Sequence, residues 1–197
     1  MLTPEEFSTL LLHHFSVVGS LSPQQVCELY RHYEVLERWN RKLNLTAIRE
    51  GADMVVRHYC ESLFLGTLLP TGKTSIADIG SGAGFPGIPM AVFRSDCRFA
   101  LIESHRRKAV FLQEATRDYA NVRVLAERAE CLEEHFDWAV CRAVKFDGSL
   151  ARLAQRVGIL TGEKEIEELR KFGAVNWEQP VRMPWGNRRV VLLGCFT

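Results

Sequence analysis

The chain has 197 residues, 47% of them hydrophobic, which predicts one good-sized core and excludes two large domains. With 25 Lys plus Arg against 24 Asp plus Glu, its formal charge is +1, so any nucleic-acid-binding surface has to be local. The six cysteines are dispersed and form no Cys-x-x-Cys pair, which favours reduced thiols over a disulfide framework or a metal site. An acidic start and the lack of a long apolar run predict a cytoplasmic protein without a membrane span.

The first third of the chain has helical patterns. Residues 3–19 open with a capping Thr, a Pro and two Glu, and Gly19 is expected to end this helix. Ser22 starts a second, longer helix with the same capping pattern, and residues 53–69 form a third. Arg and Lys on the second helix are interrupted by Glu, which fits a solvated face with ion pairs as well as an RNA-facing surface.

From Ser75 onward, short apolar strands alternate with amphipathic helices. The expected strands are residues 75–80, 98–102, 122–125 and 136–141, and the helices between them are residues 88–93 and 106–119. This alternation predicts an α/β fold with a mostly parallel sheet covered by helices on both faces. Residues 1–72 are interpreted as an N-terminal helical cap packed on the core, and residues 73–197 as the sheet-containing domain of one structural unit.

The C-terminal part is expected to finish the sheet differently. The expected elements are a helix at 150–157, a short strand at 158–160, a charged helix at 163–172 and a closing strand at 188–195. A turn at Trp185-Gly186-Asn187 precedes the closing strand. The sheet should therefore end in an antiparallel hairpin.

The stretch from Ser75 to Gly87 is hard to explain by packing alone. A buried strand runs into a turn with four glycines, at positions 80, 82, 84 and 87. Glycine permits positive φ and lacks a Cβ, so a cofactor can approach the backbone closely. Such turns serve both dinucleotides and S-adenosylmethionine, and the glycines alone do not distinguish them.

Two acidic residues favour S-adenosylmethionine. Asp78 lies two residues before Gly80, where its carboxylate would repel a pyrophosphate but attract an ammonium or sulfonium group. Glu103 ends the second strand, where a carboxylate can accept both ribose hydroxyls, the alternative being an exposed acid at a strand end. The pattern Asp-x-Gly-x-Gly-x-Gly resembles the first motif of class I S-adenosylmethionine-dependent methyltransferases, which implies a Rossmann-like sheet.

Longer motifs resemble one family, the glucose-inhibited division protein B family, over about residues 26–145. The matching segments are Trp39-Asn40, Asn44-Leu45-Thr46, Arg57-His58, Glu61-Ser62, residues 78–89, Glu103-Ser104, residues 127–130 and Cys141-Arg142-Ala143. The run Gly-Phe-Pro-Gly-Ile-Pro at 84–89 is much more specific than the glycine motif. The resemblance implies a bacterial enzyme that methylates N7 of a guanine in 16S rRNA.

The resemblance also implies roles for individual residues. The cofactor-binding set is Asp78, Gly80, Gly82, Gly84, Phe85, Glu103, Ala129, Glu130 and Arg142. The RNA-binding set is Asn44, Arg57, His58, Arg107 and Lys164, and Arg142 and His58 are expected to have positioning roles in catalysis. Four partners stay open for Arg142: Asp78, the methionine carboxylate of the cofactor, an RNA phosphate, or a purely structural ion pair.

Two positions depart from the family pattern. Thr161 stands where a lysine is common, with Lys164 as its expected substitute, and Glu61 stands where an aspartate is more usual. The Thr161 position motivates one alternative, a methyltransferase for another substrate such as a small molecule or protein. A second alternative is a non-catalytic, cofactor-binding factor of ribosome assembly. A nicotinamide oxidoreductase is the least favoured interpretation.

The chemistry of guanine N7 sets the expected mechanism. N7 has a free lone pair, so methyl transfer to it requires alignment and no essential general base. In an RNA helix N7 faces the deep, narrow major groove, so the expected target is a loop or splayed base. The expected partner is 16S rRNA within the small ribosomal subunit or a precursor, the protein is expected to act as a monomer, and no metal is expected.

Overall fold

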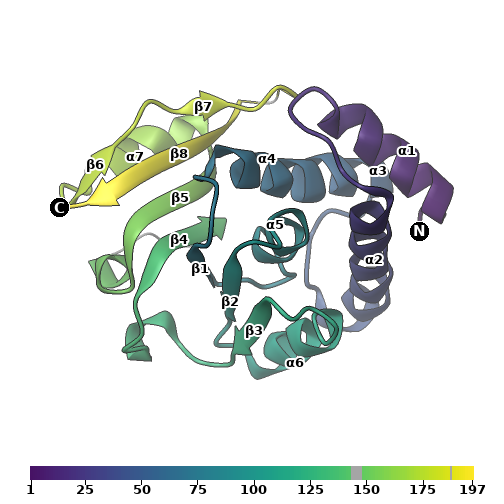
Figure 1. Cartoon of the computed structure of the whole chain (residues 1–197), viewed down its shortest axis with the longest axis horizontal. Helices are drawn as coiled ribbons and strands as arrows, with labels where there is room; N and C mark the ends of the chain where they lie inside the picture. Colours follow the sequence, from purple (N-terminus) through teal and green to yellow (C-terminus); the bar gives the residue numbers. More distant parts are fainter. Residues whose placement is uncertain (143–147, 187) are drawn as a thin grey trace.

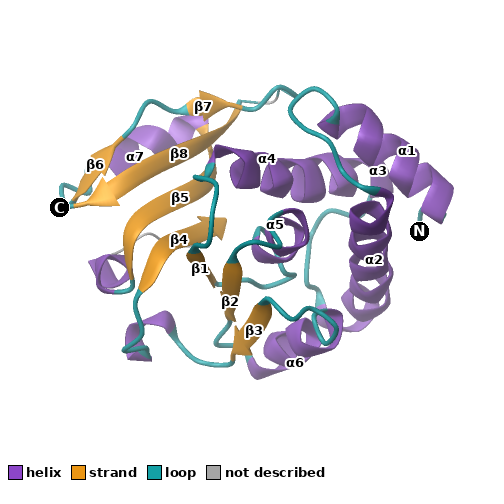
Figure 2. Cartoon of the chain, viewed as in Figure 1, coloured by secondary structure: helices purple, strands orange, loops and turns teal. Residues whose placement is uncertain are grey.

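In the computed structural model, which describes residues 1–142, 148–186 and 188–197, one mixed sheet is flanked by helices on its two faces (Figure 1). The N-terminal helices lie on one side of the sheet, where α1 and α2 are farthest from the strands and α4 runs toward them (Figure 2). Among the sequence expectations, Ala143 and Asn187 fall outside the described residues.

The N-terminal region forms the predicted helices, with one local change of helix type. The elements are α1 (Pro4–Phe15), α2 (Pro23–Leu43), α3 (Gly51–Met54), the π-helix η1 (Val55–Cys60) and α4 (Glu61–Leu68). Both predicted capping patterns are complete capping boxes, Thr3 with Glu6 and Ser22 with Gln25. α1 ends before Gly19, and the third predicted helix is continuous through η1, which periodicity cannot distinguish from an α-helix.

The sheet confirms the predicted topology. Its strands are β1 (Ser75–Ile79), β2 (Arg98–Ile102), β3 (Val122–Leu125), β4 (Phe136–Arg142), β5 (Ala154–Gly162), β6 (Val175–Trp177), β7 (Val181–Arg182) and β8 (Arg189–Phe196). The order is β3-β2-β1-β4-β5-β8-β6, with β7 also paired to β8. Strands β1 to β5 pair in parallel, and β8 runs antiparallel to β5, β6 and β7.

The remaining helices connect the strands. They are α5 (Gly87–Phe93), α6 (Arg106–Ala115), the 3₁₀ turns η2 (Ala129–Cys131), η3 (Gly148–Arg152) and η4 (Glu163–Glu165), and α7 (Ile166–Arg170). The predicted helix at 150–157 is wrong, because η3 gives way to β5 at Ala154. β5 pairs with β4 on one side and β8 on the other, and this pairing overrides a weak helical period.

The N-terminal helices share one hydrophobic cluster with helices α5 and α6. It contains Phe7 of α1, Leu36 of α2 and Tyr59 of η1 together with Ile88 of α5 and Phe111 of α6. All five are fully buried. The N-terminal helices are thereby packed directly against the helices that cover the central strands.

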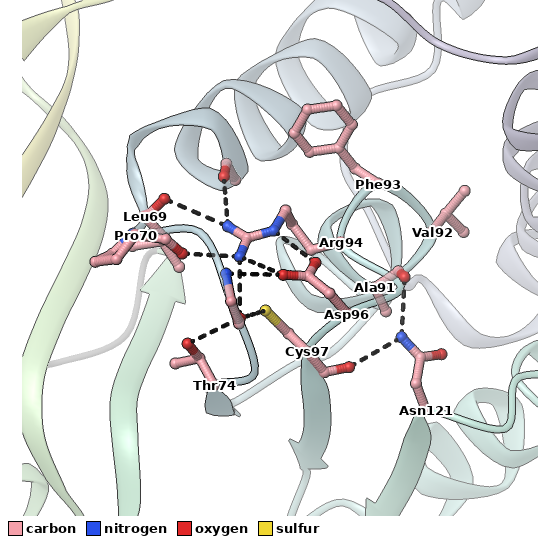
Figure 3. A network of polar contacts seen from close by, with 12 residues as sticks. Leu69, Pro70, Thr74, Ala91, Val92, Phe93, Arg94, Asp96, Cys97 and Asn121 are labelled. Atoms are coloured by element: carbon pink, nitrogen blue, oxygen red, sulfur yellow. Dashed lines mark hydrogen bonds and ion pairs between the residues drawn. The ribbon is translucent and has the colours of Figure 1, made fainter.

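Arg94, at the end of α5, ties the two regions together (Figure 3). Its guanidinium donates to the carbonyls of Leu69 at 3.3 Å and Pro70 at 2.8 Å, in the segment that leads from α4 to β1. It also forms two 2.9 Å contacts with Asp96, whose carboxylate in turn accepts from the Gly72 amide at 3.1 Å. The chain between the N-terminal helices and the sheet is therefore fixed by a nearly buried arginine, a residue that the sequence pattern did not single out.

Candidate cofactor and substrate site

The candidate site lies at the carboxyl ends of the central strands. The chain leaves β1 for β2 on one side, whereas β4 pairs on the other side of β1, so the strand order reverses there. In open α/β sheets, ligands bind in the crevice at such a switch point. The glycine turn after β1, Glu103 after β2 and Arg142 at the end of β4 all lie at this edge.

The turn needs its glycines for different reasons. Gly80, Gly82 and Gly84 have φ of 66°, 57° and 86°, values that residues with a side chain rarely adopt. A Cβ on Gly84 would lie 2.4 Å from Ile88 Cδ1, and a Cβ on Gly87 would lie 2.3 Å from Leu101 Cδ2. A Cβ on Gly82 would meet only the Gly80 carbonyl, at 3.6 Å, among the described residues. The space beside Gly82 is therefore open, as a bound cofactor requires.

Two buried carboxylates hold the turn. Asp78 Oδ2 accepts from the Ser81 hydroxyl at 2.6 Å and from the Gly87 amide at 2.9 Å. Asp78 Oδ1 is buried and has no partner within the described residues. Burial raises the pKa of Asp78 to about 7, against the lowering effect of its two hydrogen bonds. Asp78 thus retains one oxygen that a cationic ligand group can satisfy.

Glu103 is 7% exposed, which excludes the alternative of an exposed strand-end acid. Its two oxygens accept from the amides of Gly82 at 3.0 Å and His105 at 2.8 Å. These bonds join the glycine turn to the start of α6. A carboxylate oxygen has further lone pairs, so hydroxyl groups of a ligand can still donate to it.

His32 of α2 also holds the turn, through the Ala83 carbonyl. The sequence patterns did not indicate this residue. Its Nε2 lies 3.1 Å from the Ala83 carbonyl and its Nδ1 lies 2.9 Å from the Tyr59 hydroxyl. Burial lowers its pKa to about 4, so the ring is neutral. A carbonyl only accepts, so Nε2 carries the proton and Nδ1 accepts from Tyr59. The available signal was its spacing, three residues after Leu29 and four before Leu36 on the apolar face of α2.

His58 lies in η1, stacked on Phe85 with ring centroids 4.4 Å apart and planes 11° apart. Its Nε2 lies 2.7 Å from the Thr46 hydroxyl, and its Nδ1 is buried without a partner in the described parts of the chain. Burial, and then the charges of Arg142 and Arg57, lower the pKa of His58 well below its usual value. His58 is therefore a neutral residue that supports the turn through Phe85.

Arg142 forms an ion pair with Glu61. Of the four expected partners, the structure therefore shows the structural ion pair, made with Glu61 and not with Asp78. Arg142 Nη1 lies 3.5 Å from Glu61 Oε2 and also donates to the Arg57 carbonyl. Glu61 is 3% exposed and accepts from Arg189 as well, at 3.1 Å and 3.3 Å. Burial lowers the pKa of Arg142 to about 10, and Glu61 opposes this shift.

The other predicted residues lie around this edge. Asn44 is the left-handed C-cap of α2 and accepts from Arg49 at 3.1 Å. Arg57, Arg107 and Lys164 are exposed, on η1, α6 and η4. In η2, after β3, Ala129 is half-buried and Glu130 is exposed beside Arg128. The structure thus brings together Asp78, Glu103 and the glycine turn, and places His58, Arg57 and Arg142 beside one another.

Metal clusters and membrane spans are both missing from the part of the chain that the structure describes. In the described residues, no three His, Cys, Asp or Glu side chains gather as a metal site would require. No helix within residues 1–142, 148–186 and 188–197 has the length and apolar character to cross a membrane.

The chain matches one protein family over most of its length. The family GidB, described as rRNA small subunit methyltransferase G, matches residues 25–171. The protein named ribosomal RNA small subunit methyltransferase G from Xanthomonas euvesicatoria is 40% identical over 190 residues, covering 88% of this chain and 89% of its own length. The protein of the same name from Dichelobacter nodosus is 50% identical over 110 residues, covering 54% of this chain and 52% of its own.

Solved structures show the same fold at low identity. A SAM-dependent methyltransferase from Aquifex aeolicus has a TM-score of 0.60 at 12% identity and covers 73% of this chain and 93% of its own. Magnesium protoporphyrin IX methyltransferase from Synechocystis, solved with bound SAM, has a TM-score of 0.60 at 15% identity and covers 91% and 99%. The fold is therefore that of class I S-adenosylmethionine-dependent methyltransferases.

Proposed function

This chain belongs to the rRNA small subunit methyltransferase G family, and from that premise we propose that it methylates N7 of a guanine in 16S rRNA. Family membership gives the coarser activity, S-adenosylmethionine-dependent methylation of small-subunit rRNA. The observation that most directly supports binding of S-adenosylmethionine is the open approach at Gly82. It is flanked by Glu103 and by the Asp78 oxygen that has no partner in the described residues.

The residues at the turn fit this cofactor. Asp78 offers an unsatisfied acceptor for an ammonium group, and Glu103 offers lone pairs for ribose hydroxyls. Ala129 and Glu130, after β3, border the proposed adenine side, and Arg142 stands at the mouth. When bound, S-adenosylmethionine supplies an electrophilic methyl group on a cationic sulfur.

The acceptor atom requires no proton removal. Guanine N7 has a free lone pair, so the rate depends on its alignment with the methyl group. His58 is neutral and already satisfied at Nε2 by Thr46, which suits a positioning role better than general-base catalysis. Arg142, fixed by Glu61 and the Arg57 carbonyl, can orient the base or the cofactor from the mouth of the site.

The form of the substrate is part of the proposal. A net charge of +1 provides little general attraction to RNA, so we expect recognition of a folded target, the small ribosomal subunit or a precursor, by a local surface. N7 has to be presented by a loop or a splayed base, because an RNA helix hides it in the major groove. We expect the protein to act as a monomer in the cytoplasm.

The test uses subunits from a strain that lacks its own enzyme of this type. Purified protein and methyl-tritiated cofactor should label 16S rRNA in those subunits, and borohydride and aniline treatment should then cleave the RNA at one guanine. The absence of label would refute rRNA methylation. Label without aniline-sensitive cleavage would refute the assignment to N7.

A further inference from the structure

A groove separates the π-helix from the C-terminal β7–β8 hairpin. One part is a cavity of 220 Å³ whose wall includes Arg57, Glu61 and Arg189. The next part, of 330 Å³, is bounded by Glu163, Arg182 and Arg188. Met183, Gly186 and Arg189 line both parts, so the two cavities adjoin each other. We call this feature the hairpin groove.

The hairpin groove has a surplus of positive charge among the residues that the structure describes. Its arginines there are Arg57, Arg182, Arg188 and Arg189, and Arg142 adjoins them through Glu61. Two described carboxylates oppose these five arginines, and both are already engaged. Glu61 contacts Arg142 and Arg189, and Glu163 contacts Arg182 at 2.9 Å. The four arginines of the described lining thus exceed its two carboxylates by two positive charges, and Arg142 beside the groove adds a third, in a chain whose total formal charge is +1.

The electrostatics of Arg142 reflect this surplus. Burial lowers its pKa to about 10 despite Glu61, and the charges of Arg189 and Arg57 lower it further. Arginines that are held close together favour an anion between them. Arg57 and Arg188 have exposed side chains, so an anion can reach both.

The groove lies directly beside the candidate site. Arg189 opens β8 opposite Gly162, the last residue of β5, which places it at the carboxyl edge of the sheet. Arg142 ends β4 at the same edge, and Glu61 contacts both arginines. Two local backbone features border the groove, the π-helix η1 and the positive φ of 53° at Arg188. Both kinds of feature are concentrated at functional sites.

We propose that the hairpin groove binds backbone phosphates of the rRNA next to the target guanine. The proposal rests on the proposed function and adds the β7–β8 hairpin to the surface that engages RNA. Guanidinium groups bind phosphate oxygens through two parallel hydrogen bonds, and such contacts fix the register of a nucleic acid without reading its sequence. Two adjoining cavities lined by arginines suit successive phosphates of a strand better than one cofactor carboxylate.

The experiment removes charge where the side chains are exposed. The double variant Arg182→Gln with Arg188→Gln leaves Arg142, Arg189 and Glu61 in place. The matched control is Arg98→Gln with Arg117→Gln, which removes the same charge from two exposed arginines that lie outside the groove. The dissociation constant for small subunits is measured by filter binding at several KCl concentrations, and that for S-adenosylmethionine by calorimetry.

The groove variant should bind subunits about tenfold more weakly than wild type, and the slope of log K against log salt should fall by about 1 for each phosphate that the variant no longer binds. Its cofactor affinity should be unchanged, and the control should match wild type in both measurements. If groove and control variants bind subunits equally well, the groove proposal is wrong and the proposed function stands. Wild-type protein that binds cofactor but no subunits refutes the proposed function and the groove with it.

Discussion

The ring of His32 and the carbonyl of Ala83 are joined by a 3.1 Å hydrogen bond that crosses from α2 to the glycine turn. The other ring nitrogen of His32, Nδ1, accepts from the Tyr59 hydroxyl in η1. One neutral imidazole therefore connects α2 and η1 to the turn. Gly84 leaves room for this approach, because a Cβ there would lie 3.2 Å from His32 Nε2. The shape of the turn is therefore set partly by the N-terminal helices.

Replacing His32 should weaken cofactor binding. In His32→Leu the Ala83 carbonyl loses its donor, at a cost of about 1–3 kcal/mol, and the turn can relax. We expect the free energy of unfolding to fall by that amount and the dissociation constant for S-adenosylmethionine to rise about tenfold, measured by calorimetry. His32→Gln keeps an N–H donor and should recover part of the affinity. Equal cofactor affinity in the Leu and Gln variants would contradict a role for the donor.

The titrations of Asp78 and His32 should make opposite contributions to the pH dependence of the free energy of unfolding. The folded pKa of Asp78, about 7, exceeds its unfolded value of 3.8, so the native state binds more protons in this range and stability falls as pH rises. The folded pKa of His32, about 4, lies below 6.5, so the unfolded state binds more protons and stability rises with pH. In Asp78→Asn the falling contribution disappears.

As the pH rises from 4.5 to 6.5, a range within both titration windows, the free energy of unfolding should therefore increase more in Asp78→Asn than in wild type. Urea unfolding at several pH values measures this difference. Parallel curves for Asp78→Asn and wild type would show that Asp78 titrates normally.

Removing the buried carboxylate of Glu61 should destabilise the fold. Glu61→Gln leaves Arg142 and Arg189 without their shared counter-charge, and breaking a buried pair costs about 3–5 kcal/mol. The control is Glu163→Gln, whose partner Arg182 is exposed, and which should change stability by about 1 kcal/mol or less. Denaturant unfolding compares the two. Similar losses for both variants would mean that burial of Glu61 adds nothing.

Two glycines of the turn should respond differently to alanine. Gly87→Ala brings a Cβ within 2.5 Å of Asp78 Oδ2 and should destabilise the protein by about 1–3 kcal/mol, because overpacking forces its neighbours apart. Gly82→Ala meets no such contact among the described residues and should cost about 1–2 kcal/mol from its positive φ alone.

The larger effect of Gly82→Ala should be on cofactor affinity, because its methyl group enters the open approach. Calorimetry of both variants with S-adenosylmethionine, alongside thermal unfolding, separates the effects. Unchanged cofactor affinity in Gly82→Ala would show that the cofactor does not approach the backbone at Gly82.

Local signals in the sequence predicted local structure well. The capping residues Thr3 and Ser22 begin helices as predicted, and the alternation after Ser75 predicts strands β1 to β4 to within one residue of their observed bounds. These features depend on neighbours within a few residues. The predicted helix at 150–157 failed because two flanking strands, distant in sequence, determine the conformation of β5.

The candidate site was predicted only in part for the same reason. The glycine turn, Asp78 and Glu103 belong to motifs, so the pattern identified them. His32 contacts Ala83 from 51 residues away and Arg189 contacts Glu61 from 128 residues away, and no local pattern indicates such pairs. The partner of Arg142 depended on the position of Glu61, which only the packing of α4 against the sheet determines.

The guanidinium of Arg94 has a consequence for how a substrate enters. By binding the carbonyls of Leu69 and Pro70 and the carboxylate of Asp96, it removes the freedom that a hinge between the N-terminal helices and the sheet would need. These contacts oppose a lid-like swing of the helices on this connection. For the proposed guanine substrate, this predicts that the base is turned out of its own RNA to reach the site, so that the conformational work of the encounter falls on the RNA.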